Sequence, residues 1–138
     1  MSRRNWILLA TFCATAATVS AGGFFLTVHG KDNGLTVEAQ GCQDYSQAKV
    51  TGRAEGIVNG KRQSVALELT ATGKPGTYAV RKQWPAEGKW VLVFNGTAGD
   101  RITHTIVELA PDGKLRPRML MRPVTNAEIE AALLNSGA

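Results

Sequence analysis

Five residues of this sequence could ligate a soft metal ion such as copper: His29, Cys42, His104, Met119 and Met121. Thiolate and thioether sulfurs favour Cu(I), while imidazole binds either oxidation state of copper. Met119 and Met121 stand two positions apart, so a strand would carry both sulfurs on one face. The histidines are distant in sequence and no compact ligand motif is present. The candidate copper site therefore consists of His29, His104, Met119 and Met121, which only the fold could bring together.

Nucleophilic catalysis has no motif here. The sequence contains no Gly-x-Ser-x-Gly elbow, no phosphate-binding glycine loop and no His-Glu-x-x-His segment. A hydrolase would need His29 or His104 to meet Ser46, Ser64 or Ser136 in space, and nothing in the sequence indicates this. We therefore expect no enzyme activity and no cofactor other than copper, and a small hydrolase is an unsupported alternative.

A basic stretch near the C-terminus could contact a partner. Lys114, Arg116, Arg118 and Arg122 are interrupted by prolines, a pattern that discourages edge-to-edge pairing in a solvated edge strand. The alternative function is a contact with anionic lipid or an acidic protein. We expect the edge strand, and we keep Arg116, Arg118 and Arg122 as candidate partner-binding residues.

The overall charge does not favour nucleic acid as a partner. The chain of 138 residues has 16 Lys and Arg against 11 Asp and Glu, a net charge of +5. Without residues 1–21, which hold Arg3 and Arg4 and no acidic residue, the balance is 14 against 11, or +3. No dense basic stripe with interleaved aromatics is present, so we expect no nucleic-acid binding.

Residues 1–21 have the pattern of a secretory signal peptide. Arg3 and Arg4 precede an uncharged apolar stretch, and Val19-Ser20-Ala21 offers the small residues that signal peptidase reads. The alternative is an uncleaved membrane anchor, although Gly22-Gly23 and several hydroxyl residues dilute the roughly 20 apolar residues that a span needs. We expect cleavage after Ala21 and a periplasmic or secreted bacterial protein.

Cleavage would leave residues 22–138, a length that suits one domain. Cys42 would then be the only cysteine, which excludes an intramolecular disulfide. Free cysteine is among the most buried residue types, so we expect Cys42 to be buried.

Short alternating runs separated by turn residues fill residues 22–122. Asn33-Gly34 and Asn59-Gly60 are hairpin signals, and Pro111-Asp112-Gly113 marks a third turn. Asn95-Gly96-Thr97 matches a glycosylation acceptor, but we interpret Asn95-Gly96 as a turn after the strand that ends at Phe94. The spacing predicts about eight strands in an antiparallel β-sandwich.

Large side chains recur at every second position on both sides of a Pro-Ala-Glu-Gly break at residues 85–88. Tyr78, Val80, Lys82 and Trp84 would share one strand face, and Trp90, Leu92 and Phe94 one face of the next strand. Both strands would place these residues in one core. Lys82 interrupts the pattern, so we expect it near a strand end with its stem buried and its ammonium exposed.

The tail at residues 123–138 differs from the rest of the chain. Thr125 and Glu128 have the spacing of a capping box, which predicts a short helix with Ile129 and Leu133 on one apolar stripe. So short a helix is unstable alone in water. We expect it to dock on its own domain; the alternative is that Ile129 and Leu133 bind a protein partner.

The segments Pro75-Gly76-x-Tyr78 and Gly88-x-Trp90-x-Leu92 resemble the late strands of bacterial periplasmic immunoglobulin-like domains, among them the YtkA-like and the copper-resistance CopC-type domains. The resemblance covers about the central third of the chain. It implies an immunoglobulin-like sandwich that acts as an accessory or binding domain in the export compartment. CopC-type domains carry a copper-binding histidine at the mature N-terminus, whereas the expected N-terminus here is Gly22 and His29 lies further inside. The Cys…Trp…Cys spacing of immunoglobulin domains is also missing.

The sequence thus predicts an immunoglobulin-like β-sandwich over residues 22–122 with a C-terminal helical tail. The expected function is that of an exported, non-catalytic accessory or binding domain, and a copper-binding or copper-delivery protein is the alternative. A protein partner would use an edge strand or the helix, and the membrane would be reached only through an uncleaved N-terminus.

Overall fold

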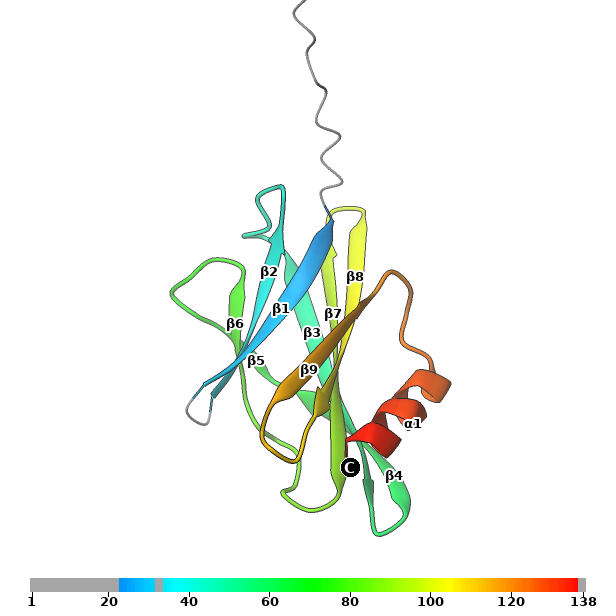
Figure 1. Cartoon of the computed structure of the whole chain (residues 1–138). Coiled ribbons are helices and arrows are strands. Elements are labelled where there is room, and N and C mark those ends of the chain that lie inside the picture. Colours follow the sequence, from blue (N-terminus) through cyan, green and yellow to red (C-terminus); the bar gives the residue numbers. More distant parts are fainter. Residues whose placement is uncertain (1–22, 32–33, 137–138) are drawn as a thin grey trace, which may run out of the picture.

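The computed structural model describes residues 23–31 and 34–136, which form two antiparallel sheets and one helix (Figure 1). The four-stranded sheet has the order β1-β2-β6-β5, and the five-stranded sheet the order β4-β3-β7-β8-β9. The bounds are β1 Phe24–Lys31, β2 Gly34–Gly41, β3 Lys49–Val58, β4 Lys61–Leu67, β5 Leu69–Ala71, β6 Thr77–Val80, β7 Lys89–Ala98, β8 Arg101–Leu109, β9 Leu115–Leu120 and α1 Asn126–Asn135. The predicted all-β sandwich with a C-terminal helix is confirmed.

Two of the predicted turns form within the described residues. Asn59 and Gly60 both have positive φ, 51° and 75°, and join β3 to β4, as the favoured two-residue hairpin turn requires. The turn between β8 and β9 is closed by the Gly113 amide, which donates to the Ala110 carbonyl at 3.0 Å. Residues 32–33, which hold part of the predicted Asn33-Gly34 turn, lie outside the described residues.

The chain changes sheets at Glu68, between β4 and β5. The Glu68 amide donates to the side-chain oxygen of Gln83 at 2.6 Å, and its carbonyl accepts from the Arg81 amide at 3.1 Å. Glu68 therefore bonds to the loop after β6, and the run that reads as one strand becomes two strands in different sheets.

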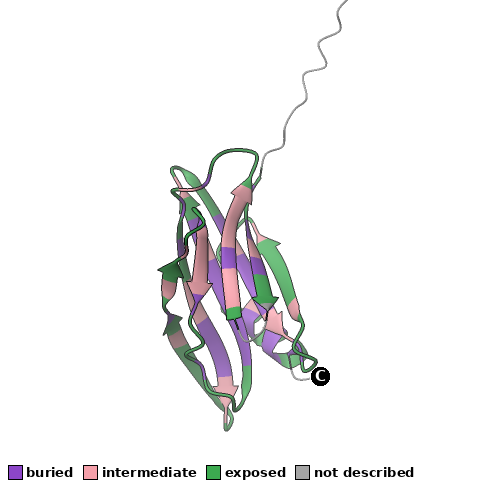
Figure 2. Ribbon diagram, turned by 90° about the vertical axis from the view of Figure 1, so that its left-hand side faces the viewer, coloured by how far each residue is buried: buried purple, intermediate pink, exposed green. Residues whose placement is uncertain are grey.

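The main core lies between the two sheets, and Figure 2 shows that the buried segments concentrate in the middle of the strands. Trp90, Leu92 and Phe94 of β7 share its inner face, as their spacing predicts, and are buried. Tyr78 and Val80 face them from the other sheet, so the two aromatic strands meet across the core. β6 ends at Val80, however, and Trp84 reaches the core from a loop.

A second apolar cluster lies on the outer face of the five-stranded sheet, where α1 packs. Val91, Val93 and Ile106 from the sheet contact Ile129 and Leu133 of the helix, and all five side chains are at most 1% exposed. β7 is therefore covered on both faces, which explains its unbroken apolar run from Trp90 to Phe94.

The predicted capping box begins this helix. The Thr125 hydroxyl accepts from the Glu128 amide at 3.3 Å, and the Glu128 carboxylate accepts from the Thr125 amide at 2.9 Å. Arg122 adds a two-pronged ion pair to the same carboxylate, at 2.8 and 3.0 Å. The helix start is thus tied to the segment that leads into it.

Two sequence predictions are wrong. Asn95-Gly96 is not a turn, because it lies inside β7, where a Cβ on Gly96 would come within 3.0 Å of Phe24 and Leu26. The glycine serves close packing between the sheets. Cys42 is exposed, because it follows the last residue of β2 in a loop outside the core.

The predicted signal peptide and its alternative, a membrane anchor, lie outside the described residues. Within residues 23–31 and 34–136, no helix has the length and apolar character to span a membrane.

Candidate functional site

The two candidate copper-binding histidines lie on opposite outer faces of the sandwich. His29 follows the core residue Val28 on β1, so it points outward from the four-stranded sheet, where its Nε2 lies 3.8 Å from Glu38. His104 lies between the buried Thr103 and Thr105 on β8, so it points outward from the five-stranded sheet. The whole core separates the two imidazoles.

The candidate sulfur ligands are not brought to either histidine. Met119 pairs with Thr105 while His104 pairs with Leu120, so Met119 and His104 project from opposite faces of their sheet. Met121 lies beyond the end of β9 and is 77% exposed. The described residues also contain no group of three or more His, Cys, Asp and Glu side chains arranged to hold a metal. The geometry therefore does not assemble the four candidate ligands into one site.

His104 contacts a side chain of the neighbouring strand β7. Its Nδ1 lies 2.6 Å from the side-chain oxygen of Asn95 on the neighbouring strand. Partial burial, and then the positive charge of Arg53, lower the pKa of His104 below its usual value. Both effects disfavour the protonated ring, which lies in a hydrogen bond on the sheet surface.

The candidate serines have structural partners. The Ser64 hydroxyl donates to the Glu55 carboxylate at 3.0 Å, and the Ser136 hydroxyl donates to the Ala132 carbonyl at 2.8 Å. Ser46 belongs to the β2–β3 loop, where its amide donates to Asp44 at 2.9 Å.

The candidate partner-binding residues differ in how exposed their side chains are. Arg116 and Arg118 are exposed on β9, an edge strand of the five-stranded sheet, and the expectation of a solvated edge strand is confirmed. Arg122 is engaged with Glu128. Ile129 and Leu133 are buried against the sheet, so the docked helix does not offer them to a partner.

An ion-pair cluster missed by the sequence analysis lies beside the helix. The Glu55 carboxylate, on a residue only 9% exposed, accepts from Arg53 at 2.8 Å, from Ser64 at 3.0 Å and from Arg62 at 3.3 Å. Arg62 also lies 3.8 Å from Glu130 of the helix. The cluster satisfies a buried charge and links β3, β4 and α1, which is a structural role.

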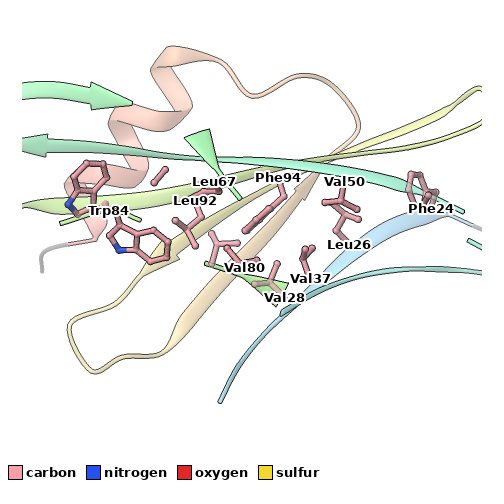
Figure 3. Close-up of a cluster of buried hydrophobic side chains, with 14 of the residues drawn as sticks. Phe24, Leu26, Val28, Val37, Val50, Leu67, Val80, Trp84, Leu92 and Phe94 are labelled. Carbon is pink, nitrogen blue, oxygen red and sulfur yellow. The ribbon is translucent and has the colours of Figure 1, made fainter. Parts of the chain in front are cut away.

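An open groove of about 880 Å³ lies at one end of the sandwich, and we call it the end groove. It lies where the start of β2, the β8–β9 turn and the loop from β6 to β7 come together (Figure 1). Its apolar lining consists of Val28, Leu35, Val80, Trp84 and Leu115. Figure 3 shows Trp84 at one end of the row of core side chains and Phe24 at the other.

Local packing explains why the groove exists. Gly30 has no side chain where β1 passes Leu115, and a Cβ there would come within 3.1 Å of the leucine. Trp84 enters the core from its loop and forms part of the floor. Leu115 therefore packs closely against β1 at Gly30, and together with Trp84 it contributes to the apolar floor of the groove.

Basic side chains border this floor. Lys82 follows the end of β6, and its ammonium lies 5.9 Å from the centre of the Trp84 ring. Lys114 and His29 complete the basic border, and no described lining residue is acidic. The sequence signal for this surface is Lys82, which interrupts the alternating pattern of large apolar residues before Trp84.

Comparisons with protein-family models, curated proteins and solved structures find no match to this chain.

Proposed function

We propose that this protein is an exported, non-catalytic binding domain that holds a small ligand with an apolar body in the end groove. Support comes from the apolar floor of the groove, formed by Val28, Leu35, Val80, Trp84 and Leu115. The groove volume of about 880 Å³ lies within the roughly 300–1,000 Å³ of typical small-molecule sites. Export rests on the signal-peptide pattern of residues 1–21, and an accessory role agrees with the immunoglobulin-like resemblance.

The groove suits binding because rigid elements hold its floor. Val28 and Val80 are buried core residues, while Leu35 and Leu115 stand at the starts of β2 and β9 and remain half-buried. A ligand would cover the exposed parts of these leucines and gain roughly 25 cal/mol for each Å² of apolar surface removed from water.

A fluorescent probe tests this proposal. N-phenyl-1-naphthylamine, a neutral apolar dye, should bind the protein purified after expression of the full chain, with saturation at one equivalent. Leu115→Gln should weaken this binding about tenfold by placing an amide in the floor. Leu134→Gln is the matched control, because Leu134 is 74% exposed on the helix and does not line the groove.

Thermal unfolding of both variants shows whether they fold. If Leu115→Gln is unstable, Leu35→Gln provides a second change in the same floor. Equal dye affinity in the groove variants and in the Leu134→Gln control would refute the proposal.

A further inference from the structure

We propose that the ligand of the end groove is a small monocarboxylic acid, whose apolar body covers the floor and whose carboxylate meets Lys82 and Lys114. This inference rests on the proposed function, since it names the chemical class of the ligand that the same groove would hold.

The charges around the groove carry the inference. Lys82 and Lys114 belong to its lining, and none of its described lining residues is Asp or Glu. Lys114 lies 3.9 Å from the carboxylate of Asp112, and both side chains are more than half exposed. An ion pair so exposed is weak, so Lys114 keeps most of its capacity to attract an anion.

His29 contributes less than the lysines do. Its Nε2 lies 3.8 Å from Glu38, on the outer face of the four-stranded sheet. Glu38 in turn binds Lys74 at 2.8 Å, and this hydrogen bond is the main reason that the pKa of Glu38 is lowered. The negative charge near His29 is therefore turned away from the floor, and the two lysines define the basic side of the groove.

The position of Lys82 places a charge directly beside the apolar surface. Its ammonium lies over the face of Trp84, itself part of the floor, at 5.9 Å from the ring centre. A cation held there is attracted by the ring and still has N–H groups to donate. A ligand that lies against Trp84 would thus bring an attached carboxylate within reach of Lys82.

This arrangement discriminates by charge and by polarity. A cationic ligand would be repelled by both lysines, and a neutral ligand would gain only the apolar contact. A small polar anion such as acetate would gain the ion pairs but leave the floor uncovered. An apolar body with one carboxylate satisfies both halves of the surface.

A matched pair of ligands tests the proposal. 4-Phenylbutyrate and 4-phenylbutan-1-ol share an apolar body and differ in the charged group. Competition with bound N-phenyl-1-naphthylamine should give an affinity for the acid about fivefold to tenfold higher than for the alcohol, the effect expected of two exposed ion pairs. The preference should shrink as NaCl is raised from 20 mM to 500 mM, because salt screens exposed charges.

The double variant Lys82→Gln/Lys114→Gln should abolish the preference for the acid, measured as the ratio of the acid and alcohol affinities in the same competition. Lys49→Gln/Lys61→Gln is the matched control, because both lysines are exposed on strands outside the groove. Equal affinities for acid and alcohol in the wild-type protein, with the dye still bound, would overturn the ligand class and leave the binding function standing. Failure of the dye itself to bind would overturn both proposals.

Discussion

Gly52 on β3 lies directly opposite Phe94 on β7, and a Cβ built on Gly52 would come within 2.8 Å of the phenyl ring. Phe94 is fully buried in the middle of the core, so the ring has no free space into which it could move. Because Gly52 has no side chain, β3 leaves the space that the phenyl ring of Phe94 fills.

Gly52→Ala should for this reason destabilise the protein by about 1–3 kcal/mol, the usual cost of overpacking a core. Gly73→Ala is the control, because a Cβ there meets nothing within 4 Å. Urea unfolding followed by tryptophan fluorescence measures both variants. Equal midpoints for the two would show that the contact between Gly52 and Phe94 is looser than described.

The docked helix gives a second prediction. Leu133→Ala should lower the free energy of unfolding by about 2–5 kcal/mol, since the side chain is 1% exposed among Val91, Val93 and Ile106. Leu134→Ala, on the exposed side of the same turn, should change it by less than about 0.5 kcal/mol. Chemical denaturation distinguishes the two variants, and similar small effects would mean that the helix is undocked in solution.

The helix start should be sensitive to acid. The hydrogen bond from Arg122, followed by that from the Thr125 amide, lowers the pKa of Glu128 from 4.5 to about 2. A carboxylate with a lowered pKa stabilises the fold fully above its unfolded value, and this stabilisation is lost as the pH falls from about 4.5 towards 2. The protection factors of the Ile129 and Leu133 amides, corrected for the intrinsic pH dependence of hydrogen exchange, should accordingly fall over this pH range.

Glu128→Gln should remove this pH dependence, because it leaves no carboxylate to protonate at the helix start. Glu130→Gln is the matched control, since Glu130 is 67% exposed and lies 3.8 Å from Arg62. A Glu128→Gln variant that keeps the wild-type dependence between pH 4.5 and 2 would assign the effect to another carboxylate.

The buried carboxylate of Glu55 gives a fourth prediction. Glu55→Gln should cost about 1–3 kcal/mol, because an amide NH₂ replaces one of the oxygens that accept from Arg53, Arg62 and Ser64. Glu68→Gln should cost no more than about 1 kcal/mol, since its ion pair with Arg81 is exposed on both sides. Thermal or urea unfolding measures both, and an equal cost would show that the Glu55 cluster is open to water.

Local signals in the sequence predicted local structure well. Asn59-Gly60 specifies a hairpin because both residues tolerate positive φ, and Thr125 with Glu128 specifies a helix start through two reciprocal hydrogen bonds. The same reasoning failed at Asn95-Gly96, because the glycine there makes room for Phe24 and Leu26 from the other sheet. The sequence does not state which strands meet across the core.

The candidate copper site depended on contacts between residues that are far apart in the sequence. Met119 and His104 occur on neighbouring strands, yet the register of β8 and β9 places them on opposite faces of the sheet. His29 and His104 are separated because β1 and β8 belong to different sheets. The end groove could not be predicted for the same reason. Its lining residues come from β1, β2, the loop after β6 and the start of β9, which are far apart in the sequence.

The direction of β1 has a consequence for how the protein is presented. β1 begins at Phe24, at the end of the sandwich farthest from Trp84, and runs towards the groove, where Val28 and Gly30 lie (Figures 1 and 3). Eight extended residues span about 25 Å. Any surface, bead or fusion partner attached ahead of Gly23 would therefore stand at the far pole of the molecule and leave the mouth of the groove pointing away from it.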